Sequence, residues 1–346
     1  MIRFGPSGIP LSCKGRTLLD GVSDVHKLGL TSMEVQFLRM NVRTAPVDID
    51  DDAGLPAEDV KNKMITGVNR GMECDELYLE DLDKLLEPGD MLHYLKGGVA
   101  DEFYRFEQIG RIAREIDVRI TLHTPYYMMF TEKEGELVER SKLGVKFGAL
   151  MTGKLNGDMV VTHVGLMEEG RTCDDVIDNV VENIREIRNW TNKHFKNGPM
   201  IGLETQAGGD VFGGLDDIVK VCKRVSGTQP VINIANVKAR GEYELEEADD
   251  YEKLFASCRK IPNGDYYITF SGVERRGRGN YRMTPIKRGD LRFEPLAEYL
   301  INSEENFTIV SNSPLKEHDA MYMRVIFERL YTREIGKELR RKQKDE

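Results

Sequence analysis

The chain has 346 residues, of which 40% are hydrophobic and 31% are charged, and no apolar run approaches the ~18 residues that a membrane span requires. Residues 1–8 lack the charged and then apolar pattern of a signal peptide, so we expect a globular protein of the cytoplasm. The formal net charge of −10 argues, taken alone, against a nucleic-acid partner.

Short apolar or β-branched segments alternate with longer amphipathic segments along the chain. The expected strands lie near residues 1–4, 32–37, 119–123, 159–163, 200–204, 231–234, 266–270 and 307–310. The expected helices cover residues 17–28, 102–115, 133–155, 173–195, 214–225, 246–259, 292–302 and 316–342. Eight strands that are each followed by a helix predict an α/β fold of the (β/α)8 type, a TIM barrel, rather than a doubly wound sheet. We expect one domain over residues 1–336, followed by a charged tail, 337–346.

One interval, residues 44–101, is too long for an ordinary loop between a strand and a helix. It contains fifteen acidic and five basic residues, whereas the rest of the chain has 44 of each. We therefore expect an acidic insertion that leaves strand two on the rim where barrel enzymes carry out their chemistry. It is either a solvated excursion, or a lid or partner surface.

Polar residues follow six successive strands at the ends where a barrel of this type carries reactive groups. These residues are His123, His163, Glu204, Asn233, Thr269 and Asn312. The first three supply two imidazoles and a carboxylate, the set that holds a catalytic zinc ion while leaving a position open. Manganese or ferrous iron accept the same ligands. The alternative is a buried, hydrogen-bonded cluster without a metal.

Five motifs in order resemble endonuclease IV, the zinc-dependent abasic-site endonucleases of the xylose-isomerase-like barrels. They are T-L-H-T-P-Y-Y (121–127), V-V-T-H-V-G (160–165), I-G-L-E-T-Q-A-G (201–208), Y-I-T-F-S-G-V-E (267–274) and I-V-S-N-S-P (309–314). The likeness spans nearly the whole chain except the insertion. It implies this barrel fold, a metal-dependent hydrolase of DNA repair, and a monomer.

Members of that family hold three zinc ions with nine ligands, and the resemblance assigns the first three to His123, His163 and Glu204, with Glu204 also catalytic. The other six ligand positions are replaced here, by Asn233, Asn236, Thr269, Tyr281, Met283 and Asn312. Three negative charges are lost in this way, and further dications would have little to offset their mutual repulsion. We therefore expect a single zinc ion at most.

The resemblance also implies contacts with DNA from the rim loops. The candidate residues are Asn41, Arg43, Tyr126, Tyr127, Arg275, Arg276, Arg278 and Arg282. Arginines clamp phosphate, and aromatic side chains wedge into a bent duplex. The tyrosines could equally pack on the barrel rim, and the basic loop could simply be solvated. The acidic insertion would repel DNA unless it folds aside.

Three functional hypotheses follow from these residues. The first is a DNA phosphodiesterase of the endonuclease IV type with one metal. The second is a catalytically degenerate barrel that binds DNA or a protein. The third is a sugar or sugar-phosphate isomerase or hydrolase, against which stands the absence of a second carboxylate pair and of a catalytic lysine at the strand ends.

Overall fold

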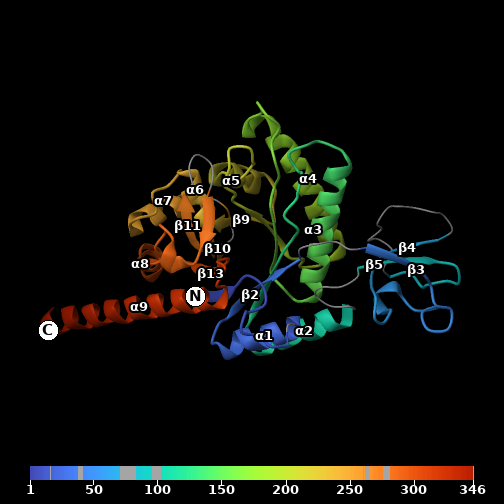
Figure 1. Ribbon diagram of the computed structural model, residues 1–346, viewed down its shortest axis with the longest axis horizontal. Coiled ribbons are helices and arrows are strands. Elements are labelled where there is room, and N and C mark those ends of the chain that lie inside the picture. The colour runs from blue at the N-terminus through green and yellow to red at the C-terminus, as the bar shows by residue number, and fades with distance from the viewer. Residues whose placement is uncertain are drawn as a thin grey trace.

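The computed structural model describes residues 1–15, 17–37, 42–70, 83–95, 103–259, 261, 265–275 and 281–345. Eight parallel strands form one sheet in the order β1-β13-β10-β9-β8-β7-β6-β2, with helices on its outer face (Figure 1). The strands are β1 (Ile2–Pro6), β2 (Ser32–Gln36), β6 (Arg119–His123), β7 (Met159–Thr162), β8 (Met200–Glu204), β9 (Thr228–Asn233), β10 (Asp265–Phe270) and β13 (Asn306–Ser311). The predicted TIM barrel is confirmed, and the strand positions agree within a few residues.

Alternation along each strand sorts side chains between the barrel interior and the helix layer. Met159, Val161, Val231, Tyr267 and Val310 form an apolar cluster separate from the main core. The residues between them in sequence, such as Val160, Ile232 and Ile309, belong to the main core under the helices. His163, Asn233, Thr269 and Asn312 each stand two residues beyond a member of the first set, so they point into the mouth of the barrel. His123 and Glu204 share this orientation, because Thr121 and Gly202, two residues before them, contact members of the same set.

The outer helices are α1 (Leu18–Lys27), α2 (Phe103–Glu115), α3 (Glu136–Lys154), α4 (Cys173–His194), α5 (Leu215–Arg224), α7 (Ala248–Cys258), α8 (Glu294–Asn302) and α9 (Glu317–Asp345). Capping boxes set three of their starts: Thr17 with Asp20 at α1, Thr172 with Asp175 at α4, and Glu247 with Asp250 at α7. Within the described parts of the chain, no helix is both long enough and apolar enough to span a membrane.

The barrel closes between β1 and β2 through a few backbone hydrogen bonds, which we call the seam, rather than through a continuous ladder. The amide of Gly8 donates to the carbonyl of Glu34 (2.7 Å), and the amide of Thr31 donates to the carbonyl of Phe4 (3.0 Å). A Cβ at Gly5 would lie 1.7 Å from the carbonyl oxygen of Ser32. The close approach of these two strands therefore requires a residue without a side chain.

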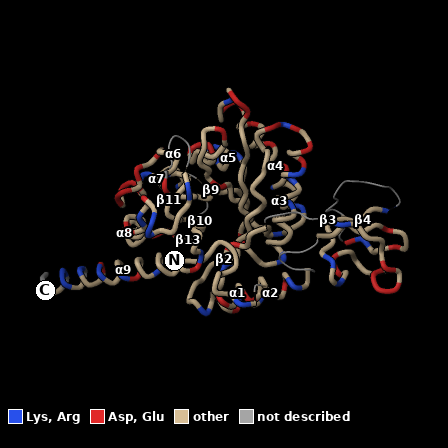
Figure 2. The backbone as a smooth tube through the Cα atoms, in the orientation of Figure 1, with Lys and Arg blue, Asp and Glu red and all other residues tan. Residues whose placement is uncertain are grey.

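The insertion contains a small antiparallel sheet in the order β3-β5-β4. Its strands are β3 (Val42–Pro46), β4 (Met64–Asn69) and β5 (Met91–Leu95), with a 3-10 turn at Ala57–Asp59. Val47, Ile65, Val68, Leu86 and Leu92 belong to an apolar core of its own. The sheet lies beside α2 and α3 (Figure 1), and Lys154 on α3 contacts Glu58 (3.0 Å). Figure 2 shows acidic residues on the outer loops of this unit.

Three elements depart from the expected pattern. A short helix, α6 (Ile234–Arg240), follows β9 directly, and a hairpin of β11 (Gly272–Arg275) and β12 (Tyr281–Thr284) follows β10. Helix α9 agrees with the helix expected over residues 316–342; it continues to Asp345 and extends away from the barrel (Figure 1).

We predict that Gly5→Ala strongly destabilises the fold because the new Cβ forces β1 away from β2 at the seam. We expect the free energy of unfolding, measured by urea denaturation, to fall by about 3 kcal/mol or more. Gly336→Ala is the control: Gly336 lies inside α9 with open space around it, so alanine should stabilise the protein by up to about 1 kcal/mol. Equal stabilities of the two variants would contradict this account of the seam.

Candidate metal centre

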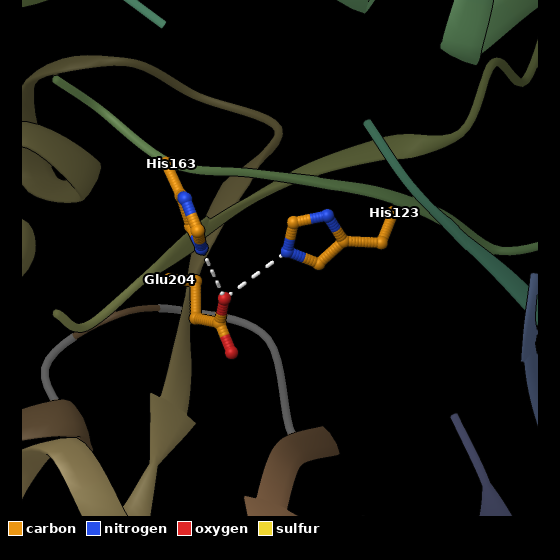
Figure 3. A group of neighbouring side chains, drawn as sticks. All are labelled: His123, His163 and Glu204. Carbon is orange, nitrogen blue, oxygen red and sulfur yellow. Dashed lines mark hydrogen bonds and ion pairs between the residues drawn. The ribbon is translucent and has the colours of Figure 1, made fainter. Parts of the chain in front are cut away.

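Three predicted ligands meet at the C-terminal mouth of the barrel. His123 ends β6, His163 directly follows β7 and Glu204 ends β8, so three neighbouring strands each supply one side chain. Figure 3 shows both imidazoles directed at the carboxylate of Glu204. The Nε2 atoms of His123 and His163 lie 3.1 Å and 2.8 Å from its Oε2. One nitrogen or oxygen from each of the three residues lies within 4.8 Å of the others, close enough for one ion to contact all three.

Hydrogen bonds on the far side of each ring orient the two imidazoles. The Nδ1 of His123 lies 2.7 Å from the carbonyl of Thr124, and the Nδ1 of His163 lies 3.3 Å from the carbonyl of Tyr126. A carbonyl there accepts a proton from Nδ1 and leaves the Nε2 lone pair for a metal. The donor set and its orientation therefore fit a divalent ion such as zinc.

The buried carboxylate and His123 carry opposite charges in the absence of a metal. Burial works against the charge of His123, but the hydrogen bond and negative charge of Glu204 outweigh burial and raise the pKa of His123 to about 9. Burial likewise opposes ionisation of Glu204, yet its bonds with both histidines hold the pKa of this carboxyl far below its usual range. Glu204 is only 4% exposed, so this compensation takes place almost without water.

The second oxygen of Glu204 is held by two of the residues that replace family ligands. Asn233 Nδ2 donates to Oε1 of Glu204 (3.0 Å), and the hydroxyl of Thr269 donates to the same oxygen (3.1 Å). These neutral donors occupy the side of the carboxylate that, by the resemblance, would bridge to a second metal. Asn233 also caps α6 by accepting from the amide of Asn236 (3.2 Å).

The other replaced positions surround the same site. Asn312 Nδ2 contacts the hydroxyl of Thr269 (3.4 Å) and the sulfur of Met283 (3.8 Å). Asn236 Nδ2 donates to the carbonyl of Thr205 (2.9 Å). Tyr281 lies on β12, and its pKa is raised by burial and by the charge of Glu204. The structure therefore gathers at the mouth all six positions that were matched to lost ligands, and fills them with neutral side chains.

The predicted DNA-contacting residues are dispersed. Tyr126 is 51% exposed, packs on the rings of both His123 and His163 with centroids 5.4 Å apart, and donates to Gln36 (3.2 Å). Tyr127 is 95% exposed. Arg282 is exposed on β12, whereas Arg43 is exposed on β3 of the insertion. Arg275 ends β11, and Asn41, Arg276 and Arg278 lie outside the described residues.

A second buried carboxyl, Glu34, was not among the predicted site residues. It lies inside the barrel on β2 and accepts hydrogen bonds from Ser7 (2.9 Å), Gln36 (2.7 Å) and Tyr267 (2.9 Å). Burial raises the pKa of Glu34, although the nearby charge of His123 lowers it. The sequence contains an indication of this carboxyl: Glu34 stands between the apolar residues Met33 and Val35 in an expected strand, and a buried carboxyl there needs hydrogen-bond partners.

The fold and the site together define a TIM barrel with a candidate metal centre at its C-terminal mouth. Residues 71–314 match the family described as Xylose isomerase-like TIM barrel, more than half of the chain, and the protein belongs to this family. The uncharacterized protein MJ0133 of Methanocaldococcus jannaschii is 24% identical over 259 residues, which cover 72% of this chain and 90% of that protein.

Two solved structures show how broad this fold similarity is. Endonuclease IV from Thermus thermophilus aligns with a TM-score of 0.58 and 15% identity, covering 95% of this chain and 99% of its own. A D-tagatose 3-epimerase-like protein aligns with a TM-score of 0.57 and 12% identity, covering 96% of this chain and 99% of its own. Identities this low support a shared fold and not a shared reaction.

We predict one bound zinc ion per chain, and a second one after Asn233→Asp is combined with Asn236→His. The double variant removes the amide that donates to Oε1 of Glu204 and restores a carboxylate and an imidazole beside it. The measurement is metal content by mass spectrometry after dialysis against zinc. The control is Asn302→Asp, an exposed position on α8. Two or more ions in the unchanged protein would contradict the mononuclear assignment.

We also predict that zinc affinity rises with pH, because the metal needs a neutral imidazole and His123 is protonated up to its pKa of about 9. Apparent affinity should increase up to about tenfold per pH unit from pH 7 and level off near pH 9. Conversely, the raised pKa stabilises the metal-free fold fully below the unfolded value near ~6.5, and this contribution is lost as pH rises through about 9. Chelator competition measures the affinity, and a pH-independent value would refute the protonation of His123.

Proposed function

We propose that the protein is a single-metal enzyme that hydrolyses a phosphodiester bond in DNA, a reaction of the endonuclease IV type. The observation that carries the proposal is the convergence of His123, His163 and Glu204 on one point at the mouth of the barrel. The order of the motifs around these residues favours this reaction over others that the fold supports.

The three ligands would hold a divalent ion that lowers the pKa of water and polarises a phosphoryl oxygen. Asn233 and Thr269 hold the carboxylate of Glu204 in one orientation. Substrate binding therefore costs no further conformational entropy of this side chain. Tyr126 packs on both histidines, and burial and the charges of Glu34 and Glu204 raise its pKa still further above neutral pH. Its hydroxyl donates to the side-chain oxygen of Gln36 (3.2 Å), and a phosphoryl oxygen at the mouth would have to replace Gln36 as the acceptor.

Two features support DNA as the substrate. Tyr127 is almost fully exposed and directly follows Tyr126, whose ring packs on both histidines, so a nucleobase near the mouth can stack on it. The described part of the acidic insertion lies beside α2 and α3, so its charges are displaced to the flank of the barrel (Figure 2). A phosphate backbone can then approach the mouth without crossing that segment.

A second candidate is isomerisation or hydrolysis of a small polyhydroxylated compound, and Glu34 favours it. This carboxyl supplies the second acid inside the barrel that the strand-end residues lacked, while Asn236, Thr269 and Asn312 offer neutral groups suited to hydroxyls. The bonds of Glu34 to Ser7, Gln36 and Tyr267 give it a structural role as well. For this reason we place it second.

We predict that the zinc-loaded protein incises a duplex with a single abasic site, and that Glu204→Gln lowers the rate by about 100-fold or more because the metal loses its only carboxylate. Gel electrophoresis of an end-labelled duplex measures the reaction, with chelator as a second inhibitor. Tyr127→Ala should weaken DNA binding with the metal content unchanged. Tyr104→Ala, which removes an exposed tyrosine of α2, is its matched control.

Absence of incision by a fully zinc-loaded protein would overturn the DNA assignment while leaving the metal centre intact. Turnover of a sugar or sugar phosphate, abolished by Glu34→Gln with zinc still bound, would establish the second candidate. If the protein takes up no zinc at any pH, both candidate functions are contradicted.

A further inference from the structure

A pocket of about 450 Å³ opens beside the candidate metal centre, between the ends of β1, β2 and β13. Its floor is apolar, with Ile9, Leu18, Met33 and Val35 among the lining residues. Its polar lining includes Ser7, Gln36, Tyr126, Asn312 and Lys316. The hypotheses drawn from the sequence used none of the floor residues and did not include Lys316.

Lys316 is a basic residue that lines this pocket, and in the described part of the chain its ammonium group is bonded only to a backbone carbonyl. Its Nζ donates to the backbone oxygen of Ile9 (3.3 Å). Among the described residues, no carboxylate lies within ion-pair distance of it, although the protein carries an excess of ten negative charges. A half-buried lysine without a counter-ion retains most of its capacity to bind an anion.

The acidic residues nearest in sequence are engaged elsewhere. Glu317 is buried and accepts from the amides of Leu11 and Ser12, both at 2.9 Å. Asp319 accepts from the amide of Ile286 (2.9 Å) and from the hydroxyl of Ser313 (2.5 Å). These carboxylates hold the loop after β1 and the loop after β13 in place and leave Lys316 uncompensated.

The backbone around Lys316 is shaped to present this side chain. Lys316 has a φ of +41°, a conformation that costs energy for a residue with a side chain. Gly8 opposite has a φ of +88°, and a Cβ there would lie 3.1 Å from Nζ of Lys316. The glycine therefore leaves room for the ammonium group at the edge of the pocket.

Two pocket residues connect it to the candidate metal centre. The ring of Tyr126 packs on both histidines, and Asn312 contacts Thr269, which in turn donates to Glu204. The Oδ1 of Asn312 is buried and has no hydrogen-bond partner in the described part of the chain, so it can accept from a ligand hydroxyl. A ligand in the pocket would thus reach the metal centre with one end.

We propose that this pocket binds an oxyanionic group, a phosphate or a carboxylate, of the substrate through the ammonium of Lys316. The apolar floor would carry the less polar part of the same molecule. That the ligand is a substrate rests on the proposed single-metal enzyme, whereas binding of the oxyanion requires only Lys316 and the pocket.

The test measures binding of inorganic phosphate and of acetate by calorimetry to metal-free protein, so that no metal-bound anion contributes. We expect Lys316→Gln to weaken binding by about tenfold or more, Lys316→Arg to retain it, and Lys61→Gln, an exposed lysine of the insertion, to leave it unchanged. Because the protein carries no metal in this measurement, failure of the metal centre and failure of the pocket are separated.

Equal phosphate and acetate binding by Lys316→Gln and the parent, or no binding of either anion to the parent, would overturn the proposal. Tighter binding of phosphate than of acetate would indicate a phosphorylated substrate, and tighter binding of acetate would indicate a carboxylate. Both results agree with the proposal. A second measurement uses the unchanged protein, so it does not depend on whether the variants fold. Phosphate should slow the acetylation of Lys316 but not that of Lys61, as followed by mass spectrometry. Equal acetylation rates with and without phosphate would also contradict the site.

Discussion

The structure of the mouth depends on how one buried carboxylate is neutralised. Glu204 cannot ionise inside a barrel unless both of its oxygens are compensated. Two imidazoles serve one oxygen, and an amide with a hydroxyl serves the other. Glu204 and these donors come from five neighbouring strands, β6 to β10, with His163 directly after β7, so the parallel order of the sheet brings all four donors to this carboxylate.

This arrangement explains why a mononuclear site is physically consistent with so many replaced ligands. An aspartate at position 233 would place a second negative charge beside Glu204, and two adjacent carboxylates disfavour each other's ionisation. Asparagine has the same shape but donates through Nδ2, and it caps α6 with the opposite end of its amide. The substitution thus removes a charge, satisfies Glu204 and starts a helix, three roles that one side chain performs because β9 ends directly in α6.

Much of the architecture follows from sequence periodicity, and the parts that do not follow have identifiable reasons. Period-two alternation predicts the eight strands and directs His123 and Glu204 inward. The small sheet of the insertion was not predicted, because its strands pair over separations that local periodicity does not report. Helix α6 spans Ile234–Arg240, too short for an amphipathic pattern to appear. Glu34 and Lys316 are not predicted as site residues, because Glu34 lies in the middle of β2 and Lys316 lies five residues after the end of β13, whereas reactive groups of such barrels are expected at the strand ends.

An acidic protein can bind an anionic substrate when its excess negative charge lies away from the binding site. The excess negative charge belongs to residues 44–101, and outside them acidic and basic residues are equal in number. The described part of that segment forms its own core and lies beside α2 and α3, on the flank of the barrel. Charges in water are largely screened beyond about 8–10 Å at physiological salt, so a flank charge weakens steeply toward the mouth. What an approaching oxyanion meets is then set locally, by an uncompensated Lys316 and a neutral lining of amides, hydroxyls and tyrosine.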